Sequence, residues 1–282
     1  MLENKVCVVT GGSRGVGRGI ALALGALGAT VYITGRTQKE GEAMLPGTIH
    51  GAAEEITARG GRGIALACDH ADDAQVAAAF ERIAGDHGRI DILVNNAFIV
   101  PDRLVEPGPF WRKPLALTRM LEVGLRSSYV SSFHAAPLMI GHGGLMAFTS
   151  SPGARCYMHG PAYGAGKAGV DKMVHDMADD LRPHGVVAVS LWLGLMRTER
   201  TLQVLEAEPE KYRGTHFESV EFPGRVLAAL YADPDRMNRS GGVYYLAELG
   251  REYGVRDIDG SQPPSYREWL GEPTRFSPAV VE

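Results

Sequence analysis

The sequence predicts an α/β protein in which helices cover both faces of one doubly wound, seven-stranded parallel sheet. Seven apolar runs of strand length alternate with stretches of helical periodicity. This strict alternation is typical of parallel strands joined by crossover helices. The 282 residues are 45% hydrophobic and 22% charged, which is ordinary globular composition, and no internal repeat or second domain is evident. We therefore expect a single domain with a large buried core.

The elements follow in order from the N-terminus. Strands are expected at residues 5–10, 30–34, 63–68, 91–96, 144–151, 186–192 and 242–246. Helices are expected at residues 16–27, 76–85, about 117–140, about 162–181 and 225–231, and a further helix between the second and third strands should end near residue 59. The domain should span residues 1–246, with a loop at 97–116, a substrate loop at 193–222 and a C-terminal extension at 247–282. Ligands bind outside the carboxyl ends of such strands, so the two loops should border a pocket.

Composition argues against several classes of partner. The net charge of -4 and the lack of a Lys/Arg cluster predict no nucleic-acid binding. The most apolar run, residues 19–35, divides at Gly28 into a helix end and a strand, so no membrane span is expected. The N-terminus lacks signal-peptide features, which predicts a cytoplasmic protein. Cys7, Cys68 and Cys156 lack metal-type spacing and should be reduced thiols, with no metal site.

A glycine-rich turn follows the first strand, at residues 10–20. Its glycines permit a tight turn and a close backbone approach, and the next helix points free N–H groups at any bound anion. A strand before and a helix after are the context in which such a turn binds a dinucleotide diphosphate. The residues expected to bind the cofactor here are Gly11, Ser13, Arg14, Gly15, Val16 and Gly17.

The end of the second strand predicts which dinucleotide binds. An NAD site usually has Asp or Glu there, whereas this chain has Gly35 and Arg36. Arg36 and Arg14 offer two guanidiniums to a 2′-phosphate, so NADP is favoured over NAD. The alternative is that both arginines face solvent. Asp69, after the third strand, is expected to reach the adenine.

The other end of the site contains a serine pair, a tyrosine and a lysine. Ser150 and Ser151 end the fifth strand, and Tyr163 and Lys167 follow on the next helix, four residues apart. Residues at this spacing share one helix face, and alone they could be surface neighbours. Together with the TGxxxGxG turn, the NNA segment at residues 95–97 and the YxxxK pair, however, they resemble the short-chain dehydrogenase/reductase (SDR) family over residues 4–246.

The resemblance implies a Rossmann-like fold and a role for each of these residues. Tyr163 would donate a proton, Lys167 would bind the nicotinamide ribose, and Ser151 would hydrogen-bond the substrate oxygen. Beside the dinucleotide, the polar strand end should contribute Asn95, Asn96 and Ala97, and the later loop Gly194 and Thr198, to the cofactor site. An adjacent ammonium favours a phenolate, so Lys167 should lower the pKa of Tyr163.

Two residues depart from the family pattern. Gly124 replaces an asparagine of the proton relay, inside the helix expected at residues 117–140. Ser127 or Ser128 is a possible substitute. Leu193 replaces a proline after the sixth strand. The serine doublet points to Ser151, but the loop to Tyr163 is one residue shorter than in the family, which leaves Ser150 as an alternative. Only one of the two can act, because neighbouring strand residues face opposite ways.

These features predict an NADP(H)-dependent oxidoreductase that reduces a ketone or aldehyde. Segments such as YGVRDIDG in the tail resemble a subgroup of carbonyl reductases that act on steroids and other apolar carbonyls. A weakly catalytic NADP-binding sensor or interaction protein and an NAD(P)-dependent secondary-alcohol dehydrogenase are the alternatives. The family commonly forms homodimers or homotetramers. His159 and Cys156 are expected as pocket wall. The candidate substrate contacts, about half of which should be ordinary core, are Phe98, Trp111, Tyr157, Met158, Trp192, Met196 and Phe217.

Overall fold

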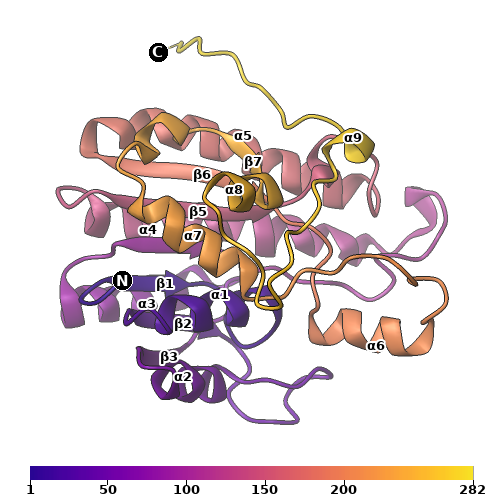
Figure 1. Ribbon diagram of the computed structural model, residues 1–282, viewed down its shortest axis with the longest axis horizontal. Helices are drawn as coiled ribbons and strands as arrows, with labels where there is room; N and C mark the ends of the chain where they lie inside the picture. Colours follow the sequence, from indigo (N-terminus) through magenta and orange to yellow (C-terminus); the bar gives the residue numbers. More distant parts are fainter. Residues whose placement is uncertain (282) are drawn as a thin grey trace.

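The computed structural model describes residues 1–281 and confirms the parallel sheet (Figure 1). Its strand order is β3-β2-β1-β4-β5-β6-β7, and every pair of neighbours is parallel. The order reverses at β1, which lies between β2 and β4, so a crevice opens there at the carboxyl ends of the strands. The strands are β1 (Val6–Val9), β2 (Thr30–Gly35), β3 (Arg62–Ala67), β4 (Ile92–Asn95), β5 (Gly144–Ser150), β6 (Val186–Trp192) and β7 (Val243–Tyr245).

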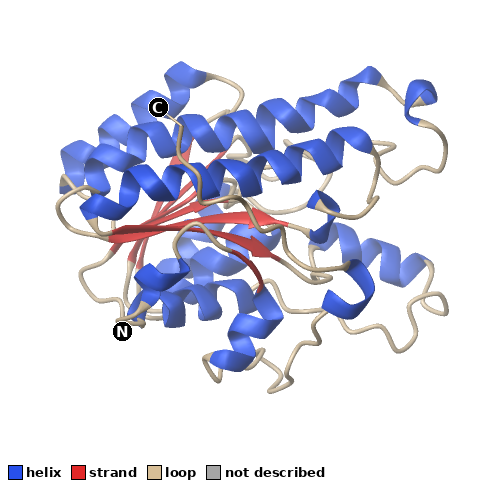
Figure 2. Ribbon diagram, turned by 90° about the horizontal axis from the view of Figure 1, so that it is seen from above, coloured by secondary structure: helices blue, strands red, loops and turns tan. Residues whose placement is uncertain are grey.

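Helices cover both faces of the sheet (Figure 2). They are α1 (Gly15–Gly25), α2 (Ile49–Ala58), α3 (Asp73–His87), α4 (Ser127–Met139), α5 (Pro161–Leu181), α6 (Glu199–Ala207), α7 (Phe222–Ala232), α8 (Leu246–Glu252) and α9 (Arg267–Leu270). Alternate residues of β1 enter different cores. Cys7 and Val9 join the core under α1, α2 and α7, whereas Val6 and Val8 join the core under α3, α4 and α5. A strand buried on both faces has to be apolar throughout, which explains the continuous apolar runs.

Local signals explain where several helices begin and end. The Asp72 carboxylate accepts hydrogen bonds from the backbone N–H groups of Ala74 and Gln75 and so caps α3. Gly88 then ends that helix in the left-handed conformation, at φ 64°. Pro161 is the first residue of α5, a position at which its missing N–H costs nothing.

The predicted continuous helix at residues 117–140 is wrong. A 3₁₀ turn (Leu115–Thr118) and a π turn (Leu121–Arg126) precede α4, and the backbone breaks at Val123 and Gly124. Gly124 has φ 149°, which side chains disfavour. The Gly124 N–H donates to Ser127 Oγ at 3.1 Å, and Ser128 Oγ donates to the Gly124 carbonyl at 2.7 Å. The two serines therefore stabilise the break by replacing helical hydrogen bonds.

The two later irregular segments contain helices that the sequence pattern did not predict. The loop at residues 193–222 carries α6, which stands apart from the sheet in Figure 1. The tail contains α8 directly after β7 and the short α9, and no further strand is found up to residue 281. The tail therefore does not form another βα unit, as expected.

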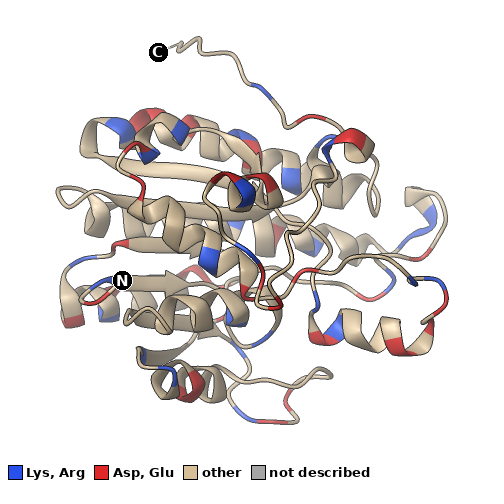
Figure 3. Cartoon of the chain, viewed as in Figure 1, with Lys and Arg blue, Asp and Glu red and all other residues tan. Residues whose placement is uncertain are grey.

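The remaining predictions about surface and thiols can be compared with residues 1–281. Basic and acidic side chains are interspersed over the helices and loops (Figure 3). Cys7 and Cys68 are buried and Cys156 is half-buried, and all three are free thiols. No helix in the described part of the chain has the length and apolarity needed to cross a bilayer.

Candidate active site

A cavity of about 370 Å³ opens at the carboxyl ends of β1 to β4. It brings together most of the residues that the sequence predicted for a cofactor. Among those lining it are Gly11, Ser13, Arg14, Gly15, Val16, Gly17, Arg36, Asp69, Asn96, Ala97 and Thr198. These residues come from four strand ends and from the loop before α6, so the parallel topology assembles them.

The glycine turn is shaped by hydrogen bonds between side chains and backbone that join it to the end of β4. Thr10 Oγ1 accepts from the N–H groups of Asn96 and Ala97 at 2.9 and 3.0 Å. The Asn96 amide donates to the carbonyls of Thr10 and Gly11 at 3.0 and 3.1 Å. A Cβ on Gly17 would overlap both the Gly11 carbonyl oxygen and the Asn96 amide. The turn is thus a cradle that only glycine leaves open, which fits the close approach of a diphosphate.

A carboxylate that the sequence analysis missed lies at this cradle. Glu199, the first residue of α6, accepts a hydrogen bond from the Gly15 N–H at 2.9 Å, and it also lines the cavity. The N-terminus of a helix attracts anions, so this carboxylate occupies a position that suits a phosphate oxygen. Its place directly after Thr198, a predicted diphosphate contact, was the only available signal in the sequence.

The two arginines differ in their surroundings. Arg14 donates to Thr37 Oγ1 at 3.1 Å and to the carbonyls of Pro46 and Gly47 at 3.0 and 2.7 Å. The Arg36 side chain is 59% exposed and lies 3.9 Å from the Asp69 carboxylate. The alternative in which both face solvent is therefore wrong for Arg14, which organises the loop after β2. Arg36 remains an exposed cation at the rim of the cavity.

Four predicted cofactor contacts do not line this cavity: Asn95, Gly194, Tyr163 and Lys167. Asn95 precedes Asn96 in an extended chain and faces the other way, with its amide donating to Ser132 Oγ of α4 at 2.9 Å. Gly194 packs against the buried Glu218 carboxyl, which a Cβ at that position would overlap. The Asn95 side chain therefore joins β4 to α4. Gly194 is a packing contact within the loop.

The tyrosine and one serine meet at the end of β5. Tyr163 Oη donates to Ser151 Oγ at 2.9 Å. Ser150 instead directs its hydroxyl to the Lys167 carbonyl of α5, at 3.5 Å. The two serines face opposite ways, as expected for neighbours in an extended strand, and it is Ser151 that faces Tyr163.

Lys167 is partly buried, one turn beyond Tyr163. Its ammonium donates to the Thr149 carbonyl at 3.0 Å and lies 4.6 Å from the centre of the Phe98 ring. Burial lowers the pKa of Lys167 to about 8, while the Asp171 carboxylate acts in the opposite direction. Asp171 is held in place by Ser190 Oγ at 2.6 Å and the Trp192 indole at 2.9 Å.

The pKa of Tyr163 is raised rather than lowered. Burial is the main cause, and the hydrogen bond with Ser151 offsets part of it. The prediction that Lys167 lowers this pKa is therefore wrong for the structure, in which the ammonium is engaged by Thr149 and the face of Phe98. The phenol keeps its proton through the neutral range.

Phe98 fills the space next to Gly124. A Cβ on Gly124 would lie 2.7 Å from the Phe98 ring, and the ring packs edge-on to Tyr163 with centroids 6.0 Å apart. The hydroxyls of Ser127 and Ser128 bond to the Gly124 backbone. Neither serine is therefore directed to the Tyr163 site as a substitute for the family's asparagine.

A second cavity, of about 330 Å³, lies beside Tyr163. Trp111, Leu117, His159 and Ala162 are among its mostly apolar lining, and His159 packs edge-on to Tyr163 with centroids 5.0 Å apart. Burial lowers the pKa of His159, so the ring is a neutral wall, as expected. Trp192 is fully buried core, and Tyr157 is 79% exposed, so neither lines this cavity.

Comparisons with known proteins agree with this arrangement. A family model described as short chain dehydrogenase matches residues 5–209. The chain is 40% identical over 279 residues to dehydrogenase/reductase SDR family member 1 of Mus musculus, covering 94% of this chain and 87% of that one. The Homo sapiens protein of the same name is 38% identical, with the same coverage.

A solved short chain dehydrogenase from Mycobacterium thermoresistibile superposes with a TM-score of 0.78 at 26% identity, covering 94% of this chain and 92% of that one. The resemblance inferred from the motifs is confirmed by sequence and by fold. The chain therefore belongs to the short-chain dehydrogenase/reductase family of oxidoreductases, which use nicotinamide cofactors.

Proposed function

We propose that this oxidoreductase is an NADP(H)-dependent reductase of apolar ketones or aldehydes. The observation that carries the proposal is the hydrogen bond between Tyr163 and Ser151, one helical turn from the partly buried Lys167. This group lies at the same edge of the sheet as the glycine cradle. A proton donor and a cofactor cavity at one edge are the two parts that carbonyl reduction needs.

The residues around the first cavity fit such a cofactor. The backbone of the glycine turn and Thr198 would hold the diphosphate, and Asp69 would lie near the adenine. Arg36, with Arg14 behind it, supports a preference for a 2′-phosphate, because no carboxylate ends β2. Lys167 would bind the nicotinamide ribose. When bound, the cofactor supplies the hydride that reduces the carbonyl carbon.

The side chains of the chain supply the proton and hold the oxygen. Ser151 would donate a hydrogen bond to the substrate oxygen, and Tyr163 would transfer its proton to that oxygen as negative charge develops there. The Lys167 ammonium, charged below a pKa of about 8, would stabilise the phenolate left behind. Burial raises the pKa of Tyr163, so the phenol is protonated at neutral pH and available as the acid that carbonyl reduction needs.

The second cavity supports an apolar substrate. Its wall of aromatic and aliphatic side chains begins at His159, in contact with the Tyr163 ring. Such a wall would bury the hydrocarbon part of a substrate whose carbonyl reaches Tyr163. Lys113 is the one formally charged side chain in that lining, which argues against a highly charged substrate.

A homodimer or homotetramer through α4 and α5 is part of the proposal. Tyr129 and Phe133 lie on α4 with 55% and 64% of their surface exposed, and exposed aromatic side chains often mark interfaces.

The test is turnover of a panel of apolar ketones and aldehydes with NADPH by the wild type and by Tyr163→Phe. We expect kcat to fall about 10²–10⁴-fold in the variant, because the proton donor is lost, with the Kd for NADPH unchanged. Tyr157→Phe is the matched control, since its ring is exposed outside both cavities. NADPH binding without turnover that depends on Tyr163 would instead support the sensor or interaction protein.

A further inference from the structure

The C-terminal tail contacts the loop at residues 193–222, hereafter the substrate loop, at three points. Asp257 hydrogen-bonds to Ser219, Tyr266 Oη donates to the His216 carbonyl at 3.2 Å, and Asp259 lies 3.8 Å from Arg197. The first contact involves the YGVRDIDG segment, which the proposed chemistry leaves without a role.

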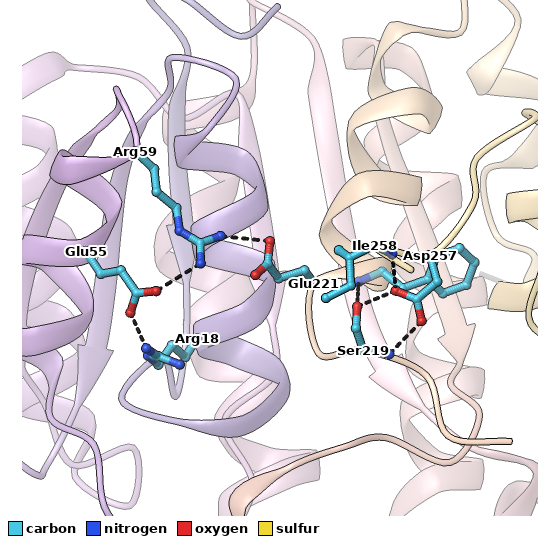
Figure 4. A network of polar contacts seen from close by, with 8 residues as sticks. Arg18, Glu55, Arg59, Ser219, Glu221, Asp257 and Ile258 are labelled. Carbon is cyan, nitrogen blue, oxygen red and sulfur yellow. Dashed lines mark hydrogen bonds and ion pairs between the residues drawn. The ribbon is translucent and has the colours of Figure 1, made fainter. Parts of the chain in front are cut away.

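Asp257 makes the most buried of these contacts. The residue is 3% exposed. Its carboxylate accepts hydrogen bonds from the Ser219 N–H at 2.7 Å and from the Ser219 hydroxyl. It also accepts from the Ile258 N–H at 2.7 Å, as drawn in Figure 4. The turn that presents it is closed by a hydrogen bond from the Asp257 N–H to the Ser261 carbonyl, 2.9 Å long. A buried carboxylate with three donors is firmly held, because each bond is charge-assisted.

Ser219 lies next to the base of the substrate loop, where the two arms of the loop pair. The Glu218 N–H donates to the Leu195 carbonyl at 2.7 Å, and the Arg197 N–H donates to the Glu218 carbonyl at 2.9 Å. The first arm continues directly into Thr198, which lines the cofactor cavity, and into Glu199 on the glycine turn. The position of Ser219 is therefore coupled to that of Thr198 at the cavity wall through the backbone hydrogen bonds between the two arms.

The base of the loop is also held from inside. The buried Glu218 side chain packs against Gly194, which leaves no room for a side chain there. Burial raises the pKa of Glu218 to about 8, so the carboxyl is neutral at neutral pH. On the far side, Glu221 pairs with Arg59, the residue directly after α2, at 2.8 Å (Figure 4). The tail supplies the remaining side of this enclosure.

We propose that the C-terminal tail positions the cofactor-binding arm of the substrate loop, and that Asp257 is the positioning residue. This inference rests on the proposed function in so far as the arm, residues 194–198, contacts the dinucleotide. Replacing one carboxylate oxygen of Asp257 with an amide group removes the charge and one of the two acceptor atoms that bind Ser219. The paired base then loosens, and Thr198 is no longer held at the cavity.

The experiment compares Asp257→Asn with Asp259→Asn, a matched change in the same turn. Asp259 forms a half-exposed ion pair with Arg197, and such pairs contribute little to stability. In hydrogen exchange on the protein without cofactor, Asp257→Asn should speed exchange of the amides of residues 195–197 and 218–219, and Asp259→Asn should not. The Kd for NADPH should rise about tenfold in Asp257→Asn, with kcat within about twofold of wild type.

Two further outcomes decide the proposal. Ser219→Ala removes one donor from the loop side and should reproduce the local exchange even where Asp257→Asn folds poorly. The positioning role would be overturned if Asp257→Asn and Ser219→Ala exchanged the amides at the base of the loop at the wild-type rate. It would also be overturned if exchange rates rose uniformly over β1 to β6. A wild-type protein that binds no NADPH would refute the proposed cofactor, whereas the exchange comparison would still test the tail.

Discussion

The two ends of the site are formed by different chemical groups, backbone at one end and ionisable side chains at the other. At the phosphate end, backbone groups and glycines form the cradle, and the cations lie at its rim, Arg36 more than half exposed. At the reacting end, Tyr163 and Lys167 are partly buried side chains whose pKa values desolvation has moved. The function of the phosphate end therefore depends on the shape of the cradle, and that of the reacting end depends on the protonation states of Tyr163 and Lys167. Changes at the phosphate end should alter cofactor affinity, and changes at the reacting end should alter rate and its pH dependence.

The largest effect on cofactor affinity is expected for Gly17→Ala at the phosphate end. The new Cβ would overlap the Gly11 carbonyl and the Asn96 amide, so the cradle has to open. We expect the Kd for NADPH to rise at least about 100-fold in a fluorescence titration. Gly85→Ala in α3 is the control, because a Cβ there meets no atom within 4 Å. Unchanged affinity in Gly17→Ala would mean that the turn is not the diphosphate site.

Arg36→Asp should change which cofactor binds. Replacing the rim cation with an anion should weaken NADPH binding about 10- to 100-fold and leave NADH binding nearly unchanged. The same substitution at Arg82, on the exposed face of α3, should affect neither cofactor. If the wild type binds the two cofactors equally, the preference for NADP(H) is refuted.

The reacting end should show its own pH dependence. Lys167 is an ammonium below its pKa of about 8 and loses its proton above it, whereas the raised pKa of Tyr163 keeps the phenol protonated. The value of kcat/KM should therefore fall about tenfold per pH unit above pH 8. Lys167→Arg, if active, should move this decline upward, because guanidinium stays charged. A wild-type profile that is flat to pH 10 contradicts the assignment.

Glu199→Gln should have the smallest effect, and in the opposite direction. Removing the negative charge beside the Gly15 N–H should tighten NADPH binding about two- to fivefold at low salt, since the carboxylate competes for the same helix end. The gain should shrink as ionic strength rises. Glu206→Gln, exposed on the same helix, is the control. Weaker binding in Glu199→Gln would show that the glutamate assists the cofactor.

Several features could be read from the sequence because they depend on local physics. The buried strands appear as apolar runs, and glycines stand where a Cβ would collide, as at Gly17. The break at Gly124 could not be predicted, because helical periodicity continues on both sides of it. It depends on hydroxyl bonds from Ser127 and Ser128 and on the Phe98 ring, which comes from another loop.

The sequence by itself determined the succession of strands and helices along the chain, the glycine turn and the Tyr163–Lys167 spacing. Each of these follows from neighbours within a few residues. Only the tertiary structure decided that Glu199 contacts Gly15, 184 residues away, and that Asp257 contacts Ser219, 38 residues away. It also decided the direction of the Tyr163 pKa shift. Contacts between distant segments and burial arise only when the chain packs, so no local pattern contains them.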